Sequence, residues 1–151
     1  MDGSRPLNGA RSATALVLFA LLSLGAIGCD DGRPKRVPVA GQVTIDGKPL
    51  GYGFIRVYPT AGGRLAQGQI DSQGRFVLTT YEKGDGVTLG THTVEILAGE
   101  PIGTTRTKWH APKKYSERAT SGLMVTIDTA RDGLPIELTW DGGKPFVEAT
   151  P

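Results

Sequence analysis

The sequence predicts an all-β fold, an antiparallel β-sandwich of seven strands that follows an N-terminal signal helix. Apolar and polar residues alternate over several short stretches between residues 37 and 140, which is the period of a half-buried strand. The chain also holds 22 Gly and 10 Pro in 151 residues, a composition that favours turns over helices. Two sheets packed face to face would bury the apolar side of every strand.

The first 28 residues have the layout of a signal peptide. Arg5 and Arg11 precede an apolar stretch over residues 13–27. This stretch is shorter than the ~20 residues of a permanent membrane helix, and Asp30 and Asp31 follow it closely. We therefore expect residues 1–28 to be cleaved, and residues 29–36 to form a short polar tether.

The single cysteine, Cys29, lies at the end of this segment, and it can form neither an intramolecular disulfide nor a multi-thiolate metal site. Ala26-Ile27-Gly28-Cys29 resembles the lipobox of bacterial lipoproteins, except that Ala26 replaces the usual Leu. The resemblance implies that Cys29 carries acyl chains such as palmitate and becomes the new N-terminus. Two or three chains hold a protein stably on a lipid bilayer. Plain secretion, with a free thiol at Cys29, is the alternative.

The domain over residues 37–140 contains the seven strands, which turns of Asp and Gly separate. In chain order, the strands are expected at Val37–Ile45, Ile55–Val57, Leu65–Ile70, Phe76–Thr80, His92–Ala98, Leu123–Ile127 and Leu134–Trp140. Turns are expected at Asp46-Gly47, Asp71–Gly74, Gly84–Gly86 and Asp132-Gly133, because a short acceptor side chain beside Gly suits a tight turn. Residues 141–151 are expected to be a flexible tail.

Several strings within the domain are similar to carboxypeptidase regulatory-like domains: Val39–Val43, Asp46–Leu50, Asp71–Phe76 and Gly90–Val94. The resemblance implies a transthyretin-like or immunoglobulin-like sandwich without catalytic activity. His92 stands where these relatives often have Tyr. Pro112–Tyr115 and Thr120–Leu123 also resemble small planctomycete lipoproteins of this type.

The connection from Gly99 to Gly122 is the candidate ligand site, because loops of this length are usually functional or disordered. It holds five basic and two acidic residues. The candidate ligand-binding residues are Arg106, Lys108, Trp109, Lys113, Lys114 and Tyr115. Aromatic rings stack on sugars and cations bind anionic groups, so envelope polysaccharide or another envelope protein is the expected partner. The alternative is that Trp109 and Tyr115 cover a sheet edge.

Other functions find little support in the composition. The formal net charge is +2, and a signal peptide directs the domain out of the cytoplasm, so we expect no nucleic acid partner. His92 and His110 have no accompanying ligand pattern, so we expect no metal and no cofactor. No serine lies in a nucleophile-elbow context. The sequence therefore predicts a non-catalytic binding or structural module, lipid-anchored outside the cytoplasm to an inner or outer membrane. An accessory subunit or small hydrolase is the alternative.

Overall fold

The computed structural model describes Gly3 and residues 32–149, and a compact unit begins at Pro34. The predicted signal helix and Cys29 lie outside the described residues. In the part of the chain that the structure describes, no helix has the length and hydropathy needed to cross a membrane.

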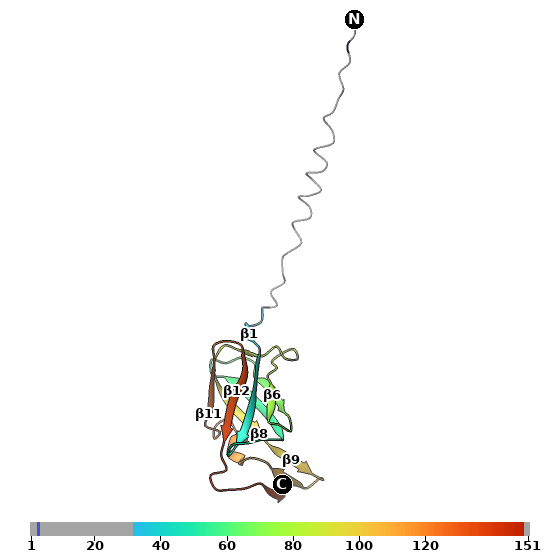
Figure 1. Cartoon of the computed structure of the whole chain (residues 1–151), viewed down its shortest axis with the longest axis vertical. Coiled ribbons are helices and arrows are strands. Elements are labelled where there is room, and N and C mark those ends of the chain that lie inside the picture. Colours follow the sequence, from blue (N-terminus) through green and yellow to red (C-terminus); the bar gives the residue numbers. More distant parts are fainter. Residues whose placement is uncertain (1–2, 4–31, 150–151) are drawn as a thin grey trace. The chain divides into compact units, whose positions relative to one another are not determined.

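The folded unit is all-β (Figure 1). Each of the seven predicted strand segments contains a strand, and short strands are added between and after them. The strands are β1 (Arg36–Val37), β2 (Val39–Ile45), β3 (Lys48–Pro49), β4 (Gly53–Pro59), β5 (Ala66–Ile70), β6 (Arg75–Val77), β7 (Val87–Thr88), β8 (Gly90–Leu97), β9 (Gly99–Ile102), β10 (Arg106–Trp109), β11 (Leu123–Ile127), β12 (Arg131–Leu138) and β13 (Phe146–Ala149). A 3-10 turn, η1 (Lys113–Ser116), precedes β11.

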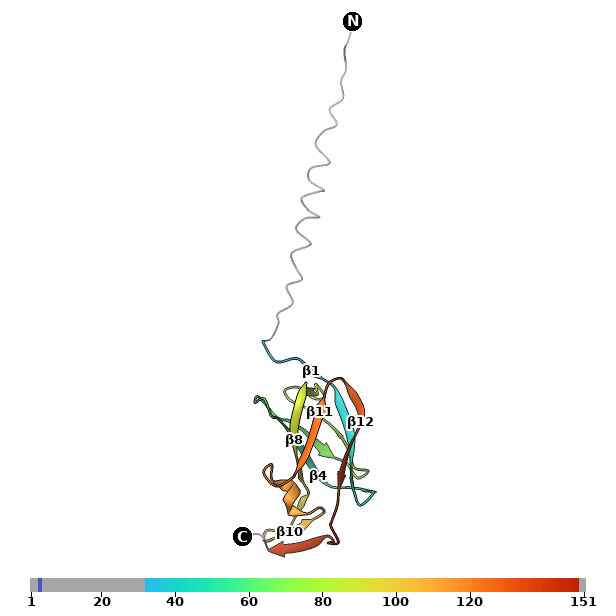
Figure 2. The same ribbon diagram turned by 90° about the vertical axis from the view of Figure 1, so that its left-hand side faces the viewer.

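The longer strands form two main sheets, which lie in two layers (Figure 2). One sheet has the order β11-β8-β4-β5, and all its pairs are antiparallel. In the other sheet, β2 pairs with β12 on one side and with β3 and β6 on the other. The small strands β9, β10 and β13 form a third sheet, and β1 pairs with β7.

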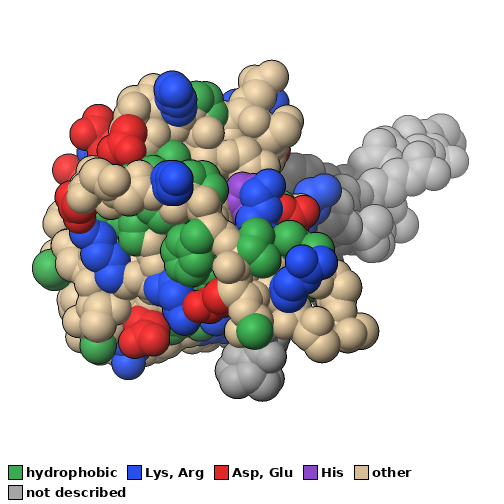
Figure 3. Space-filling view, turned by 90° about the horizontal axis from the view of Figure 1, so that it is seen from below, with side chains coloured by type: hydrophobic (Ala, Val, Ile, Leu, Met, Phe, Trp, Pro, Cys, Tyr) green, Lys and Arg blue, Asp and Glu red, His purple; other side chains and the backbone are tan. Residues whose placement is uncertain are grey.

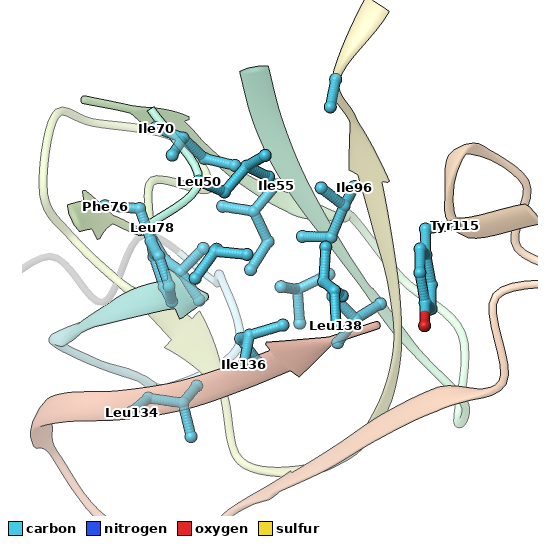
Figure 4. Close-up of a cluster of buried hydrophobic side chains, with 14 of the residues drawn as sticks. Leu50, Ile55, Ile70, Phe76, Leu78, Ile96, Tyr115, Leu134, Ile136 and Leu138 are labelled. Carbon is cyan, nitrogen blue, oxygen red and sulfur yellow. The ribbon is translucent and has the colours of Figure 1, made fainter. Parts of the chain in front are cut away.

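The core lies between the two main sheets and is built by the predicted alternation. On β2, Val39, Val43 and Ile45 are buried while Gln42 is exposed. Figure 4 shows the buried side chains of β12 facing those of the other sheet, such as Ile55 and Ile96. Because alternate residues of a strand point to opposite faces, this burial pattern confirms which side of these strands faces inward.

One strand pair departs from the predicted antiparallel arrangement, because β12 runs parallel to β2. β11 belongs to the opposite sheet, so the chain crosses between layers after β11 instead of making a hairpin within one sheet. The predicted turn at Asp132-Gly133 is also wrong. These residues lie inside β12, at a bulge between Arg131 and Leu134, and Gly133 has a φ of +97° there.

Two of the predicted turns have the expected geometry. Asp46 and Gly47 have φ values of +48° and +76°, which is the left-handed backbone of a tight hairpin turn. At the second turn, an oxygen of Asp71 accepts hydrogen bonds from the backbone N–H groups of Gln73 and Arg75, at 2.8 and 2.9 Å. Both Asp residues therefore have structural roles.

The loop before β7 is held by Asp85, whose role is wider than that of a turn residue. Its carboxylate accepts a 2.7 Å hydrogen bond from the Thr80 N–H and pairs with the Arg36 guanidinium at 2.9 Å. Burial opposes ionisation, yet the backbone hydrogen bonds and Arg36 together lower the pKa of Asp85. Because the compact unit begins at Pro34 and Arg36 belongs to β1, the last residues of the predicted tether over residues 29–36 are part of the folded domain.

The predicted flexible tail at 141–151 is wrong for residues 146–149. These residues form β13, which pairs with β10 from Phe146 opposite Trp109 to Ala149 opposite Arg106. The ring of Phe146 also makes an edge contact with Trp140, 6.5 Å between centroids. The four residues of β13 have no buried face, so the sequence shows no strand period there.

Candidate functional site

The predicted irregular connection from Gly99 to Gly122 contains two strands and η1. β9 and β10 pair over four residues each, from Ile102 opposite Arg106 to Gly99 opposite Trp109. Their residues are partly or fully exposed on both faces, so the strands lack the apolar alternation that reveals a half-buried strand. The connection is therefore an ordered part of the domain rather than a loop.

Trp109 is held by the C-terminal strand. Its Nε1 donates a 2.8 Å hydrogen bond to Glu148, and the ammonium of Lys113 lies 2.9 Å from the same carboxylate. The Lys113 ammonium also lies 5.4 Å from the Trp109 ring centroid. Hydrogen bonds from Lys113 and then Trp109 lower the pKa of Glu148. Trp109 thus connects β13 to β10, and Lys113 connects β13 to η1.

Tyr115 and Lys114 both lie on η1, and each already has partners within the domain. Tyr115 is 5% exposed and belongs to the core cluster. Figure 4 shows it at one side of that cluster. Its hydroxyl accepts a 3.2 Å hydrogen bond from the Thr139 N–H. Lys114 forms an ion pair with Asp141, which raises the pKa of the lysine and lowers that of the aspartate. The burial of Tyr115 favours the alternative interpretation, in which this ring covers a sheet edge and does not bind a ligand.

The remaining candidates lie on β10. Arg106 is exposed, whereas Lys108 is half-buried between Glu100 and Val147 on the neighbouring strands. Figure 3 views this end of the domain and shows acidic and basic side chains interspersed over it. The structure therefore brings the six candidates to one region, but Asp141 and Glu148 balance much of their positive charge. Both acids come from the segment that the sequence analysis treated as a tail.

Sequence reasoning also missed a buried carboxylate, Glu95 on β8. It accepts a 2.8 Å hydrogen bond from the Tyr58 hydroxyl and a 2.9 Å hydrogen bond from the Arg118 N–H. Burial first, and then the hydrogen bond to Glu95, raise the pKa of Tyr58. Since Arg118 follows η1, Glu95 ties the segment after η1 to the outer face of the main sheet. This arrangement is structural, because both carboxylate oxygens already have partners.

The two histidines occupy different environments. His92 is fully buried, with Nδ1 2.9 Å from the Gly90 carbonyl and Nε2 3.4 Å from the Thr88 hydroxyl. Burial lowers its pKa, so the ring is neutral near pH 7. His110 pairs through Nε2 with Glu100, at 2.7 Å. Within Gly3 and residues 32–149, no group of three His, Cys, Asp or Glu side chains is placed to hold a metal ion.

An open groove on the outer face of the domain is the second candidate site. Its volume is about 1140 Å³, and it extends over β4, β5, β6, β2 and the bulge of β12. Six of its lining side chains are exposed: Gln42, Phe54, Gln67, Gln69, Arg75 and Val77. They come from four strands and are the residues that alternate with the core. No sequence pattern distinguishes these residues, because each is an ordinary outward position on its own strand.

Comparisons of the chain with protein-family models, with curated proteins and with solved structures found no match.

Proposed function

We propose that this protein is a lipid-anchored module of a bacterial cell envelope, held outside the cytoplasm by acyl chains on Cys29. The observation that carries the proposal is the order of segments along the chain: two arginines, an apolar stretch over residues 13–27, and the string Ala26–Cys29. A cysteine at this place reaches the membrane face once the apolar stretch has been threaded. Two or three acyl chains then retain the protein on the bilayer.

The distance between lipid and domain supports the same proposal. The compact unit begins at Pro34, five residues after Cys29. Five extended residues span at most about 18 Å. A mature protein beginning at Cys29 would therefore keep its domain next to the bilayer, where it can contact other envelope components.

We further propose that the domain is of the transthyretin-like, carboxypeptidase regulatory-like type. Support comes from the two main sheets, which have four strands each and lie in two layers, and from the tight turn at Asp46-Gly47. The function is then non-catalytic, either binding or structural. Envelope polysaccharide and another envelope protein are the proposed partners besides the bilayer.

Replacement of the acylated cysteine tests the anchor. Wild-type protein expressed in a bacterial host should partition into the detergent phase of Triton X-114, and Cys29→Ser should move it to the aqueous phase or leave it unprocessed. Ala26→Leu is the matched control, because it restores the usual first position of the motif and should keep the partitioning. Recovery of wild-type protein in the aqueous phase, with a free thiol at Cys29, would refute the proposal in favour of plain secretion.

A further inference from the structure

The outer groove exists because the two main sheets are joined at one corner. β5 is the edge of one sheet and β6 belongs to the other, and Gln67 and Thr79 connect them through two backbone hydrogen bonds of 2.9 and 2.8 Å. The outward surface therefore continues from β4 across β5, β6 and β2 to β12. At ~4.8 Å between neighbouring strands, this path is about 19 Å long.

Small residues keep this surface hollow. Ala40, Gly84 and Gly133 line the groove and fill little of it. Gly68 on β5 has a different role, because a Cβ there would lie 2.6 Å from the Val77 carbonyl oxygen. Only glycine allows β6 to approach β5 so closely, so the corner that shapes the groove depends on this position.

Three glutamines contribute amide groups to the polar lining. The side chains of Gln67 and Gln69 are exposed and make no hydrogen bond to any residue that the structure describes. Gln42 donates one hydrogen bond from Nε2 to the Gln73 carbonyl, at 2.8 Å, which fixes the direction of its amide. An amide offers both a donor and an acceptor, and a hydroxyl group on a ligand needs both.

Apolar side chains stand among these amides. Phe54 is 48% exposed and lies directly across from Gln69, while Val77 on β6 is 55% exposed. Binding sites often combine an exposed aromatic ring with nearby amides that have no partner. The ring packs against a flat apolar face of the ligand, and the amides form a few hydrogen bonds with it.

The charges in the groove balance. Asp71 and Asp132 line it together with Arg75 and Lys83, and Asp71 and Arg75 pair with each other at 2.9 Å. A polyanion or a polycation would therefore find no net attraction. The charge balance favours an uncharged ligand with many hydroxyl groups.

We propose that this groove binds a neutral, β-linked polysaccharide chain. A β-linked pyranose presents a flat face of C–H groups, which would lie on Phe54, while its hydroxyls would bond to Gln67 and Gln69. An extended chain fits an open path of about 19 Å better than a compact ligand does. The inference rests on the proposed binding function, but it does not depend on the acylation of Cys29.

Affinity electrophoresis of the full chain tests the site, in an amine-oxide detergent because glycoside detergents would compete. The gels contain hydroxyethyl cellulose as the neutral β-linked probe, with dextran as the α-linked and dextran sulfate as the anionic comparison. Hydroxyethyl cellulose should retard the wild-type protein. Phe54→Ala and Gln67→Ala/Gln69→Ala should weaken this binding at least fivefold. Met124→Ala, which removes a 62% exposed side chain from β11, should leave it unchanged.

Each other outcome overturns the proposal. Absence of retardation by hydroxyethyl cellulose, or retardation that Phe54→Ala leaves intact, would exclude this groove as the site. Stronger retardation by dextran or dextran sulfate would show that the ligand class is wrong. All variants should melt within about 2 °C of the wild type, because the substituted side chains are exposed. The same preparations, partitioned in Triton X-114, report the lipid anchor separately, so failure of one proposal is distinguishable from failure of the other.

Discussion

Val94→Asp should unfold the domain. Val94 is fully buried in the middle of β8, with Val57 of β4 on one side and Leu123 of β11 on the other. Removing a fully buried valine side chain costs about 2 kcal/mol in lost burial. Placing a carboxylate there without a partner adds several kcal/mol, or forces the group to stay protonated. The total, roughly 5 kcal/mol or more, equals the whole stability of a marginal domain.

The assay is urea unfolding of the full chain followed by far-ultraviolet circular dichroism. Met124→Asp is the matched control, because Met124 lies opposite Thr93 on the neighbouring strand and is 62% exposed. It should change the free energy of unfolding by at most about 0.5 kcal/mol. If Val94→Asp has the same urea midpoint as Met124→Asp, then the face assigned to the core is wrong.

Three further predictions concern the third sheet and the core histidine. Trp109→Ala should destabilise the domain by roughly 2 kcal/mol and increase amide exchange in β13, because the ring and its bond to Glu148 hold that strand; unchanged exchange would instead favour a free stacking residue. Lys113→Ala/Lys114→Ala should lower the free energy of unfolding by less than about 1 kcal/mol, since both ion pairs are partly exposed. A larger loss, measured by urea unfolding, would contradict the small contribution expected of these two ion pairs. Because burial depresses the pKa of His92 below its unfolded value, its contribution to stability is present above about pH 6.5 and lost as the pH falls through the folded pKa. Wild-type protein should therefore lose more stability than His92→Gln between pH 7 and pH 5, and equal losses would contradict the buried, neutral ring.

The strands of the core could be predicted from the sequence because one face of each is buried. His92, Val94 and Ile96 of β8, and Ala98 just after it, are each at most 1% exposed, and the same period is visible in the printed sequence. The turn at Asp46-Gly47 was equally visible, since a left-handed backbone favours Asp and Gly. Local chemistry alone determines both features.

Features that depend on contacts between distant segments could not be predicted in this way. The parallel pairing of β2 with β12 joins residues more than ninety positions apart, and nothing in either strand specifies its direction. β13 has no buried face, so its pairing with β10 left no period in the sequence. The groove combines outward residues of four strands and the bulge of β12, and Glu95 looks like any polar residue until Tyr58 and Arg118 meet it.

The surroundings of the candidate residues in the connection could not be predicted from the connection alone. Trp109, Lys113 and Lys114 do lie in one region, as the loop composition indicated. Their acidic partners come from a later segment of the chain: Glu148 belongs to β13, and Asp141 precedes it. A count of charges within the connection therefore overstated the field that a ligand would meet there.

The intact mass of the mature protein, extracted from bacterial membranes with detergent, tests the central claim most directly. We expect a chain that begins at Cys29 and carries the added mass of two or three acyl chains with their glycerol. Mild alkaline hydrolysis should then remove the ester-linked acyl chains. A mature chain with an unmodified Cys29, or one that retains residues 1–28 on the membrane, would contradict the account.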